Sequence, residues 1–144
     1  MLRGATRNVY YTNLDQWGPI LTTPGLVFVN LQYDNCQPEL DAAEQRFGVK
    51  IHAWDDIDLK DDLDSAAALI SALDLVITAP TSVAAMAGAL GVPVWDLAGK
   101  EDNWSTLGTD YMPWYPSMRL FLKARNGNWE DDTLKRSLPV YSFK

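Results

Sequence analysis

Short apolar runs alternate along the chain with longer segments in which apolar residues recur at helical spacing. Residues 26–31 (LVFVNL) and 75–78 form apolar, β-rich runs bounded by turn residues, which predicts strands buried on both faces. The expected strands are 9–11, 26–31, 49–53, 75–78, 92–95 and 119–123, and the expected helices are 14–21, 38–48, 65–73, 82–90 and 129–137. Strands alternating with helices through short connections predict an α/β fold with a mostly parallel sheet covered on both faces.

Turn and cap residues set the expected helix ends. Thr12 or Asn13 is expected to cap the first helix, and Pro38 to begin the second, which ends at Gly48. The acidic run at 54–65 contains six aspartates, but its spacing lacks the central glycine and alternate oxygen ligands of a calcium loop. We therefore interpret it as a solvated loop whose later aspartates cap the helix 65–73. The three candidate caps are Asp61, Asp62 and Asp64.

Residues 75–95 (LVITAPTSVAAMAGALGVPVW) are the most informative segment of the chain. They predict a strand, a tight turn at 79–82, a helix of small residues and a second strand. Free backbone N–H groups where such a helix begins, with two hydroxyls beside them, suit a phosphate group. No glycine-rich phosphate motif is present, so the pattern equally fits a tightly packed strand–helix–strand unit.

The helix of this segment carries its apolar residues on one expected stripe. The residues at i, i+3, i+4 and i+7 are Val83, Met86, Ala87 and Leu90. This spacing predicts that the stripe faces the sheet and that Met86 belongs to the core. Gly88 lowers helix propensity by about 1 kcal/mol relative to alanine, a cost that close packing of a neighbour would justify.

Residues 96–118 show neither helical nor strand periodicity and are expected to form a long irregular segment. Long loops in compact domains are usually functional or disordered, and four aromatic residues argue against disorder. These are Trp104, Tyr111, Trp114 and Tyr115.

Amino-acid composition limits the kinds of binding partner and the cellular compartment expected for this chain. The 144 residues, 47% of them hydrophobic, suffice for one core, and a formal charge of −7 argues against nucleic acid or an acidic membrane surface as a partner. A single cysteine, Cys36, excludes a disulfide framework, and no run is long and apolar enough for a membrane span or signal peptide, so a cytoplasmic location is expected. No metal site is predicted.

The sequence contains one histidine and one cysteine, and each is a candidate for a catalytic role. His52, the only histidine, could act as a general base, but no nucleophile pattern accompanies it, which favours a structural or solvent contact at a strand end. Cys36 lies in a polar loop without a basic neighbour, so its thiol is not expected to be reactive.

Several motifs in chain order resemble the C-terminal half of GT-B glycosyltransferases, and most of all the heptosyltransferase-like domains associated with tetratricopeptide repeats. They run from about residue 10 to 129 and comprise FVNLQY at 28–33, LDLVI at 73–77, TSVA at 81–84, AGALGVPVW at 87–95 and PWYPS at 113–117. The resemblance implies a Rossmann-like three-layer sandwich, half of a GT-B fold. It also implies that residues 1–144 are one nucleotide-sugar-binding domain, without the first strand and the N-terminal acceptor domain.

The same resemblance implies site residues. The turn that holds the donor diphosphate in that family falls on Thr81, Ser82, Val83 and Ala84, and a carboxylate that holds the donor ribose is similar in place to Glu39. A glutamate in a first helical turn is explained equally well by the helix dipole.

The long loop is similar to the family's tryptophan-rich loop near the donor. There Trp104 or Tyr115 could stack on a base or sugar, or could instead plug the end of the sheet. Lys100 and Arg119 are candidate partners for phosphate, with surface ion pairs as the alternative.

Two departures from the family pattern concern activity. Relatives carry an aspartate directly before the threonine and a histidine four residues after it, where this chain has Pro80 and Ala85. We therefore expect the isolated chain to bind a nucleotide-sugar better than it turns one over. No catalytic residue is assigned. The resemblance implies no separate cofactor. An acceptor domain or a second copy would be the partner. The alternatives are a non-catalytic Rossmann-like binding or assembly module and, less favoured, a flavodoxin-like enzyme.

Overall fold

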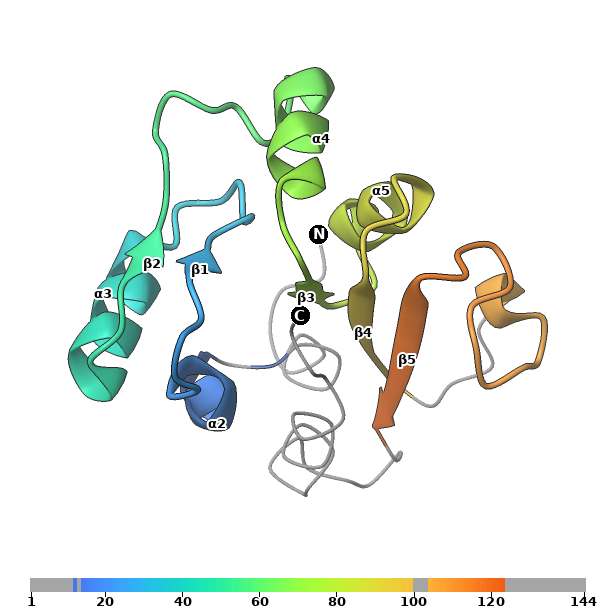
Figure 1. The fold of residues 1–144 in the computed structure, drawn as a ribbon, viewed down its shortest axis with the longest axis horizontal. Coiled ribbons are helices and arrows are strands. Elements are labelled where there is room, and N and C mark those ends of the chain that lie inside the picture. The colour runs from blue at the N-terminus through green and yellow to red at the C-terminus, as the bar shows by residue number, and fades with distance from the viewer. Residues whose placement is uncertain (1–11, 13, 100–103, 124–144) are drawn as a thin grey trace.

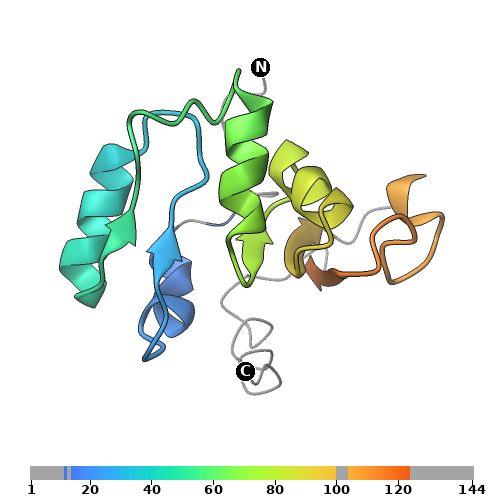
Figure 2. The same ribbon diagram turned by 45° about the horizontal axis from the view of Figure 1, so that its top comes forward.

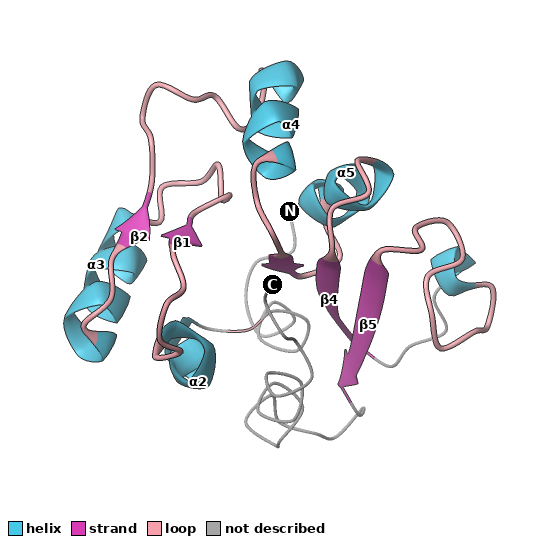
Figure 3. Cartoon of the chain, viewed as in Figure 1, coloured by secondary structure: helices cyan, strands magenta, loops and turns pink. Residues whose placement is uncertain are grey.

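The computed structural model describes residues 12, 14–99 and 104–123 of the chain. Helices and strands alternate along it, and every described strand pair is parallel, as Figure 3 shows. The elements in chain order are η1 (Leu14–Trp17), α2 (Gly18–Leu21), β1 (Phe28–Val29), α3 (Gln37–Phe47), β2 (Ile51–His52), α4 (Leu63–Ser71), β3 (Val76–Thr78), α5 (Ser82–Ala89), β4 (Val94–Gly99), η2 (Trp104–Thr106) and β5 (Met118–Lys123). The predicted α/β class is confirmed.

The strands form two small parallel sheets. One pairs β1 with β2, and the other has the order β3-β4-β5, with Val76 opposite Val94 and Val94 opposite Met118. Figures 1 and 2 both show β1 next to β3, and Phe28 of β1 packs in the same cluster as Ile77 of β3. Among the described strands no backbone ladder joins β1 to β3, so side chains make this junction.

Successive residues of β4 face opposite sides of the larger sheet, as strand geometry requires. Val94 belongs to a core under α4 and α5, whereas Trp95 and Leu97 pack with Ile20 of α2 on the other side. Strand β2 is covered by α3, where Leu40 and Ala43 pack on Ile51. Each helix therefore buries an apolar face on a strand, and the carboxyl ends of β1 and β3 lie beside each other.

Helices α3 and α4 begin and end close to the predicted positions. Gly48 ends α3 in the left-handed region, at a φ of 67°, where glycine has no steric penalty. Asp62 caps α4 by accepting a hydrogen bond from the Ser65 amide at 3.0 Å. The same contacts lower the pKa of Asp62, because the Ser65 hydroxyl and amide favour the ionised carboxylate.

The start of the chain's described part differs from the predicted single helix. A 3-10 turn, η1, leads into the four-residue α2. There the Thr12 hydroxyl accepts a hydrogen bond from the indole of Trp17 at 2.8 Å. Asn13, the predicted strand 9–11 and the predicted helix 129–137 lie outside the described residues.

Two strand predictions need correction. The run 26–31 yields only Phe28–Val29, and Val27 is 76% exposed. Among the described strands β1 pairs only with β2, and after β1 the chain leaves the sheet toward a cavity at Leu31. Conversely, β4 continues to Gly99 beyond the predicted end at Trp95, so part of the segment predicted as irregular is regular strand. Pairing with β5 along its whole length stabilises this extension.

Helix α5 meets the sheet through a different stripe from the one predicted. Ala84, Ala87 and Gly88 are buried, whereas Leu90 is 44% exposed. Small side chains bring the helix close to the strands, and the larger Val83 and Met86 turn toward α4, where they line a cavity. Met86 also packs against the core, although it is only partly buried. Gly88 meets Tyr115 so closely that a Cβ there would lie 2.6 Å from Tyr115 Cγ, which confirms the predicted close approach.

Candidate functional site

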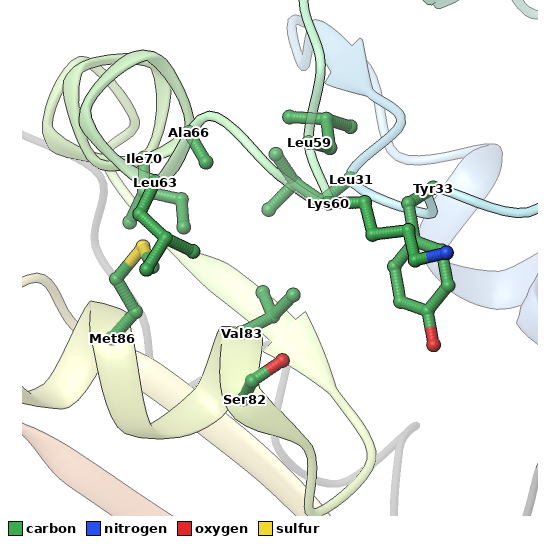
Figure 4. A pocket seen from close by; sticks show the side chains of 10 residues that line it. All are labelled: Leu31, Tyr33, Leu59, Lys60, Leu63, Ala66, Ile70, Ser82, Val83 and Met86. Atoms are coloured by element: carbon green, nitrogen blue, oxygen red, sulfur yellow. The ribbon is translucent and has the colours of Figure 1, made fainter.

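A cavity of about 230 Å³ opens at the carboxyl ends of β1 and β3, and Figure 4 shows its lining. Four segments contribute: the chain after β1, the connection before α4, α4 itself and the first turns of α5. The lining residues are Leu31, Tyr33, Leu59, Lys60, Leu63, Ala66, Ile70, Ser82, Val83 and Met86. Ligands of open α/β sheets characteristically bind outside the carboxyl ends of the strands, which makes this cavity the leading candidate site.

Apolar side chains form most of the cavity wall. In Figure 4, Leu63 and Met86 approach from one side and Leu31 and Leu59 from another, with Val83 between the two groups. Ile70 is buried in the main core at one edge, so the cavity floor is continuous with that core. Such a wall favours a ligand with an apolar or planar body.

Polar groups gather at the remaining edges. Lys60 and Tyr33 both line the cavity, and Figure 4 shows the Ser82 hydroxyl at the beginning of α5. Neither of the two ion pairs of the described chain involves Lys60. The nearby Asp58 carboxylate accepts hydrogen bonds from the amides of Lys60 and Asp61, which lower its pKa. That carboxylate stabilises its own turn, and the Lys60 side chain reaches the cavity.

The turn before α5 has the geometry expected of a helix start. Thr81 is extended, with φ −135° and ψ 177°, and its carbonyl accepts the first bond of the helix, from the Ala85 amide at 3.2 Å. The Thr81 hydroxyl makes no capping bond and lies 3.4 Å from the hydroxyl of Thr78. The amides at 82–84 precede this first bond, so the positive end of the helix dipole points away from β3.

The four residues of the predicted phosphate turn lie in different environments. Ser82 and Val83 line the cavity, Thr81 is exposed beside it, and Ala84 is buried against the sheet. Glu39 lies elsewhere: it is exposed on α3, where its Oε1 accepts from the Leu14 amide at 3.4 Å. That contact joins α3 to η1, which gives the glutamate a structural role.

The described residues that line the cavity include none of the other predicted contacts. Lys100 lies outside the described residues, and of Trp104 only the backbone is described, at the beginning of η2. Tyr115 packs against Gly88 on α5, which fits the plugging alternative. Arg119 makes a cation–π contact, with its guanidinium carbon 5.1 Å from the centre of the Phe121 ring.

His52 and Cys36 behave as structural residues. His52 is exposed at the end of β2 and stacks on Trp54, with ring centres 6.1 Å apart. Burial raises the pKa of the Cys36 thiol, which disfavours the reactive thiolate. Within the described ranges no cluster of three His, Cys, Asp or Glu side chains could hold a metal ion.

Sequence reasoning missed two features of this region. Leu59, Lys60 and Leu63 were predicted to belong to a solvated acidic loop and the start of its helix, whereas all three line the cavity; the two leucines among the aspartates were the available signal. Asp96 was placed in an irregular segment, but it lies on β4, only 2% exposed, and desolvation raises its pKa to about 6. The apolar residues that follow it, Leu97 and Ala98, were the available signal for a continuing strand.

Together the fold and the cavity define an α/β protein with a crevice at the carboxyl ends of its parallel strands. Over 126 residues the chain is 46% identical to Protein FlbA of Caulobacter vibrioides, a match that covers 88% of this chain. The chain spans about a fifth of the length of that relative, 21%. No protein-family profile and no solved structure matches the chain. No helix in the described part of the chain could cross a membrane, because none is both long and apolar enough.

These comparisons correct the predicted membership in the glycosyltransferases. The curated protein that matches at 46% identity is named FlbA and carries no indication of glycosyltransferase activity, and neither a family profile nor a structure supports a GT-B domain. The resemblance rested on short motifs such as TSVA and AGALGVPVW, which are also what a tightly packed strand–turn–helix–strand unit requires. Membership in that family, and the transferase activity expected from it, are therefore withdrawn.

Proposed function

We propose that this chain is a non-catalytic binding module with a Rossmann-like, three-layer arrangement, and that the cavity beside β1 and β3 is its ligand site. The ligand is a small molecule with an apolar or planar body and an anionic end. The observation that carries the proposal is the cavity itself, which four separate segments build at the strand ends where open α/β sheets bind ligands.

The polarity of the lining supports this ligand chemistry. Leu31, Leu59 and Met86 offer dispersion contacts to the body, and Lys60 with Ser82 offers a cation and a hydroxyl to the anionic end. The free amides at the start of α5 add to the attraction for an anion. Phosphate-bearing nucleotides have this combination of body and charge, and they are the probes we choose.

The residues that line the cavity favour binding over catalysis. The lining includes no carboxylate, histidine or cysteine, so among the described residues the Ser82 hydroxyl has no carboxylate or imidazole base beside it in the cavity. Pro80 and Ala85 stand beside the turn where a hydrogen-bonding side chain would add to ligand contacts. Binding without turnover is the activity these groups support.

Thermal unfolding with AMP, ADP, UMP, UDP, the parent nucleosides and inorganic phosphate tests the proposal. A ligand at 100 times its dissociation constant adds about 2.7 kcal/mol to the free energy of unfolding, which raises the melting temperature measurably. We expect at least one nucleotide to do so and to bind more tightly than its nucleoside. If the folded chain shows no shift with any of these probes, the cavity is not a site for this ligand class.

Two pairs of variants locate the binding. Met86→Trp should fill the cavity and abolish the nucleotide shift, whereas Met86→Leu should retain it. Lys60→Gln should weaken nucleotide binding about tenfold and leave the nucleoside unaffected, since a charge-assisted contact contributes about 1.5 kcal/mol. Lys50→Gln is the matched control, because Lys50 pairs with Glu44 away from the cavity. Equal weakening by both lysine changes would assign the effect to net charge alone.

A further inference from the structure

The segment 104–117, here called the aromatic loop, is held in one conformation by its own hydrogen bonds. The Thr109 amide donates to the Thr106 carbonyl at 2.9 Å, and the Thr109 hydroxyl lies 2.6 Å from the same oxygen. The indole of Trp114 donates to the Ser105 carbonyl at 2.8 Å. Leu107 adopts the left-handed region, with φ 51°, just before Gly108. These contacts make the loop compact.

Core residues fix the base of the aromatic loop to the sheet. Met112 is 9% exposed and belongs to the core that includes Val94 and Met118. Tyr115 packs against Gly88 of α5, and the Met118 amide bonds to the Tyr115 carbonyl at 2.9 Å. In Figures 1 and 2 the loop lies at the end of the molecule beyond β5, opposite α3. The loop is therefore anchored as well as internally bonded.

Three large apolar side chains of this loop nevertheless face solvent. Leu107 is 65% exposed, Tyr111 57% and Trp114 56%. Exposed apolar groups on a segment whose conformation is already fixed lose little entropy on binding, and tryptophan and tyrosine dominate the energetics of protein interfaces. Folding gains little from the exposed surface of these side chains. Large apolar side chains that stay exposed on an ordered segment are characteristic of surfaces that bind a partner.

Charge indicates the partner's chemistry. Asp110 is the one charged residue in the sequence of 104–117, the loop contains no lysine or arginine, and the whole chain has a formal charge of −7. The Trp114 indole N–H is already bonded, so the ring offers its faces more than its donor. A guanidinium stacks on tryptophan and tyrosine faces and pairs with a carboxylate. We propose that the aromatic loop is a protein-docking surface for a partner segment that presents arginine beside apolar side chains.

Two other occupants fit less well. A second copy of this chain would bring a second charge of −7 to the interface, and like charges oppose association. Nucleic acid stacks on aromatic side chains but needs a basic surface for its phosphates, which this loop lacks. Dimerisation through this loop is an outcome that the following experiment can reveal.

Fluorescence anisotropy with a labelled twelve-residue peptide of repeating Leu-Arg-Pro tests the proposal, with lysine and glutamate versions for comparison. We expect the arginine peptide to bind most tightly and the glutamate peptide not to bind. Trp114→Ala and Tyr111→Ser should each weaken the arginine peptide about tenfold or more. Tyr111→Ser guards against a folding artefact, because Tyr111 is exposed whereas Trp114 stabilises the loop. Far-ultraviolet circular dichroism verifies that both variants fold.

Matched controls separate this surface from general acidity. Trp54→Ala removes an exposed tryptophan that follows β2, outside the aromatic loop, and should leave peptide binding unchanged. Asp110→Asn should weaken binding, and Asp56→Asn, the same change of charge in the acidic segment, should not. Equal effects of the two aspartate changes, equal binding of arginine and lysine peptides, or no binding of the arginine peptide would overturn the proposal. A dimer in sedimentation analysis that Trp114→Ala dissociates would overturn it in favour of a second copy.

Discussion

The carboxyl group of Asp96 is buried inside the protein, and few polar contacts offset its removal from water. Its side chain is 2% exposed, and in the described part of the chain its Oδ1 atom has no hydrogen-bond partner. Strand register puts it between Thr78 of β3 and Leu120 of β5. Burial raises its pKa to about 6, because removal from water disfavours the ionised form. The group is therefore protonated in mildly acidic solution and ionised at neutral pH.

We predict that Asp96→Asn stabilises the protein at pH 7.5 and has little effect at pH 4. The folded chain binds a proton more tightly than the unfolded chain, so ionisation destabilises the fold progressively as pH rises from about 4 to 6. A shift of this size corresponds to about 3 kcal/mol, an upper limit for the gain at pH 7.5 because asparagine is also polar. Urea unfolding at both pH values measures it, with Asp56→Asn as the exposed control. A stability difference that does not change with pH would show that Asp96 does not titrate in this range.

Contact between α5 and Tyr115 decides how close this helix can lie to its neighbours. Gly88 offers no side chain, and the Tyr115 ring occupies the space, so an added Cβ would lie 2.6 Å from Cγ and 2.8 Å from Cβ of the tyrosine. Both atoms belong to the base of the side chain, where rotation gives little relief. The aromatic loop can therefore pack closely on α5 because residue 88 has no side chain.

Gly88→Ala should destabilise the protein even though alanine favours helix. Helix propensity gains about 1 kcal/mol, whereas overpacking of a filled core costs about 1 to 3 kcal/mol. In a Tyr115→Ala background the same substitution should reverse sign and stabilise the protein, because the obstructing ring is gone. Urea unfolding of the four proteins of this double-mutant cycle measures both effects. The contact is unimportant if Gly88→Ala is stabilising with the tyrosine present.

Helices were more predictable from this sequence than strands. Helices α3, α4 and α5 were expected nearly where they lie, because Pro38, Gly48 and Asp62 act locally on the backbone. Strand β1 has two residues, fewer than predicted, and β4 continues to Gly99, farther than predicted. Both differences arise because strand length depends on a pairing partner distant in sequence. Local pattern therefore determines where a helix ends but not how far a ladder extends.

The candidate cavity was predictable only in part. Ser82 and Val83 were expected to face a ligand because they open a helix after a strand, which is a local property. Leu31 and Lys60 join them only through the tertiary arrangement of β1 with the connection before α4, and no local pattern encodes that meeting. Glu39 is not among the lining residues, and its first-turn position did not reveal that its carboxylate accepts a hydrogen bond from the Leu14 amide.

The molecule as a whole depends on side chains to unite its two described sheets. Ile20, Trp95, Leu97 and Phe121 form a buried cluster against which Phe28 of β1 and Ile77 of β3 both pack. The ladders themselves, β1 with β2 and β3 with β4 and β5, share no strand. Cohesion between the two parts is therefore hydrophobic rather than a continuous backbone network.

Ile20→Ala should loosen this union selectively. Removal of a buried isoleucine side chain costs about 2 to 5 kcal/mol, and this one bears on the cluster where the two sheets meet. Hydrogen exchange followed by mass spectrometry should show amides of β1 and β2, and that of Asn30, which donates to the His52 carbonyl just after β1, losing more protection than those of β3 and β4. An equal loss in both sheets would mean that they unfold as one cooperative unit.

The parallel pairing of β4 with β5 has a consequence for how the chain folds. A parallel pair cannot close through a hairpin, and between Gly99 and Met118 the described segment contains only a 3-10 turn. The described part of this connection therefore supplies no α-helix that would bring the two strands together. Because non-local closure carries an entropy that later contacts must repay, we expect docking of β5 to be among the last and slowest steps of folding.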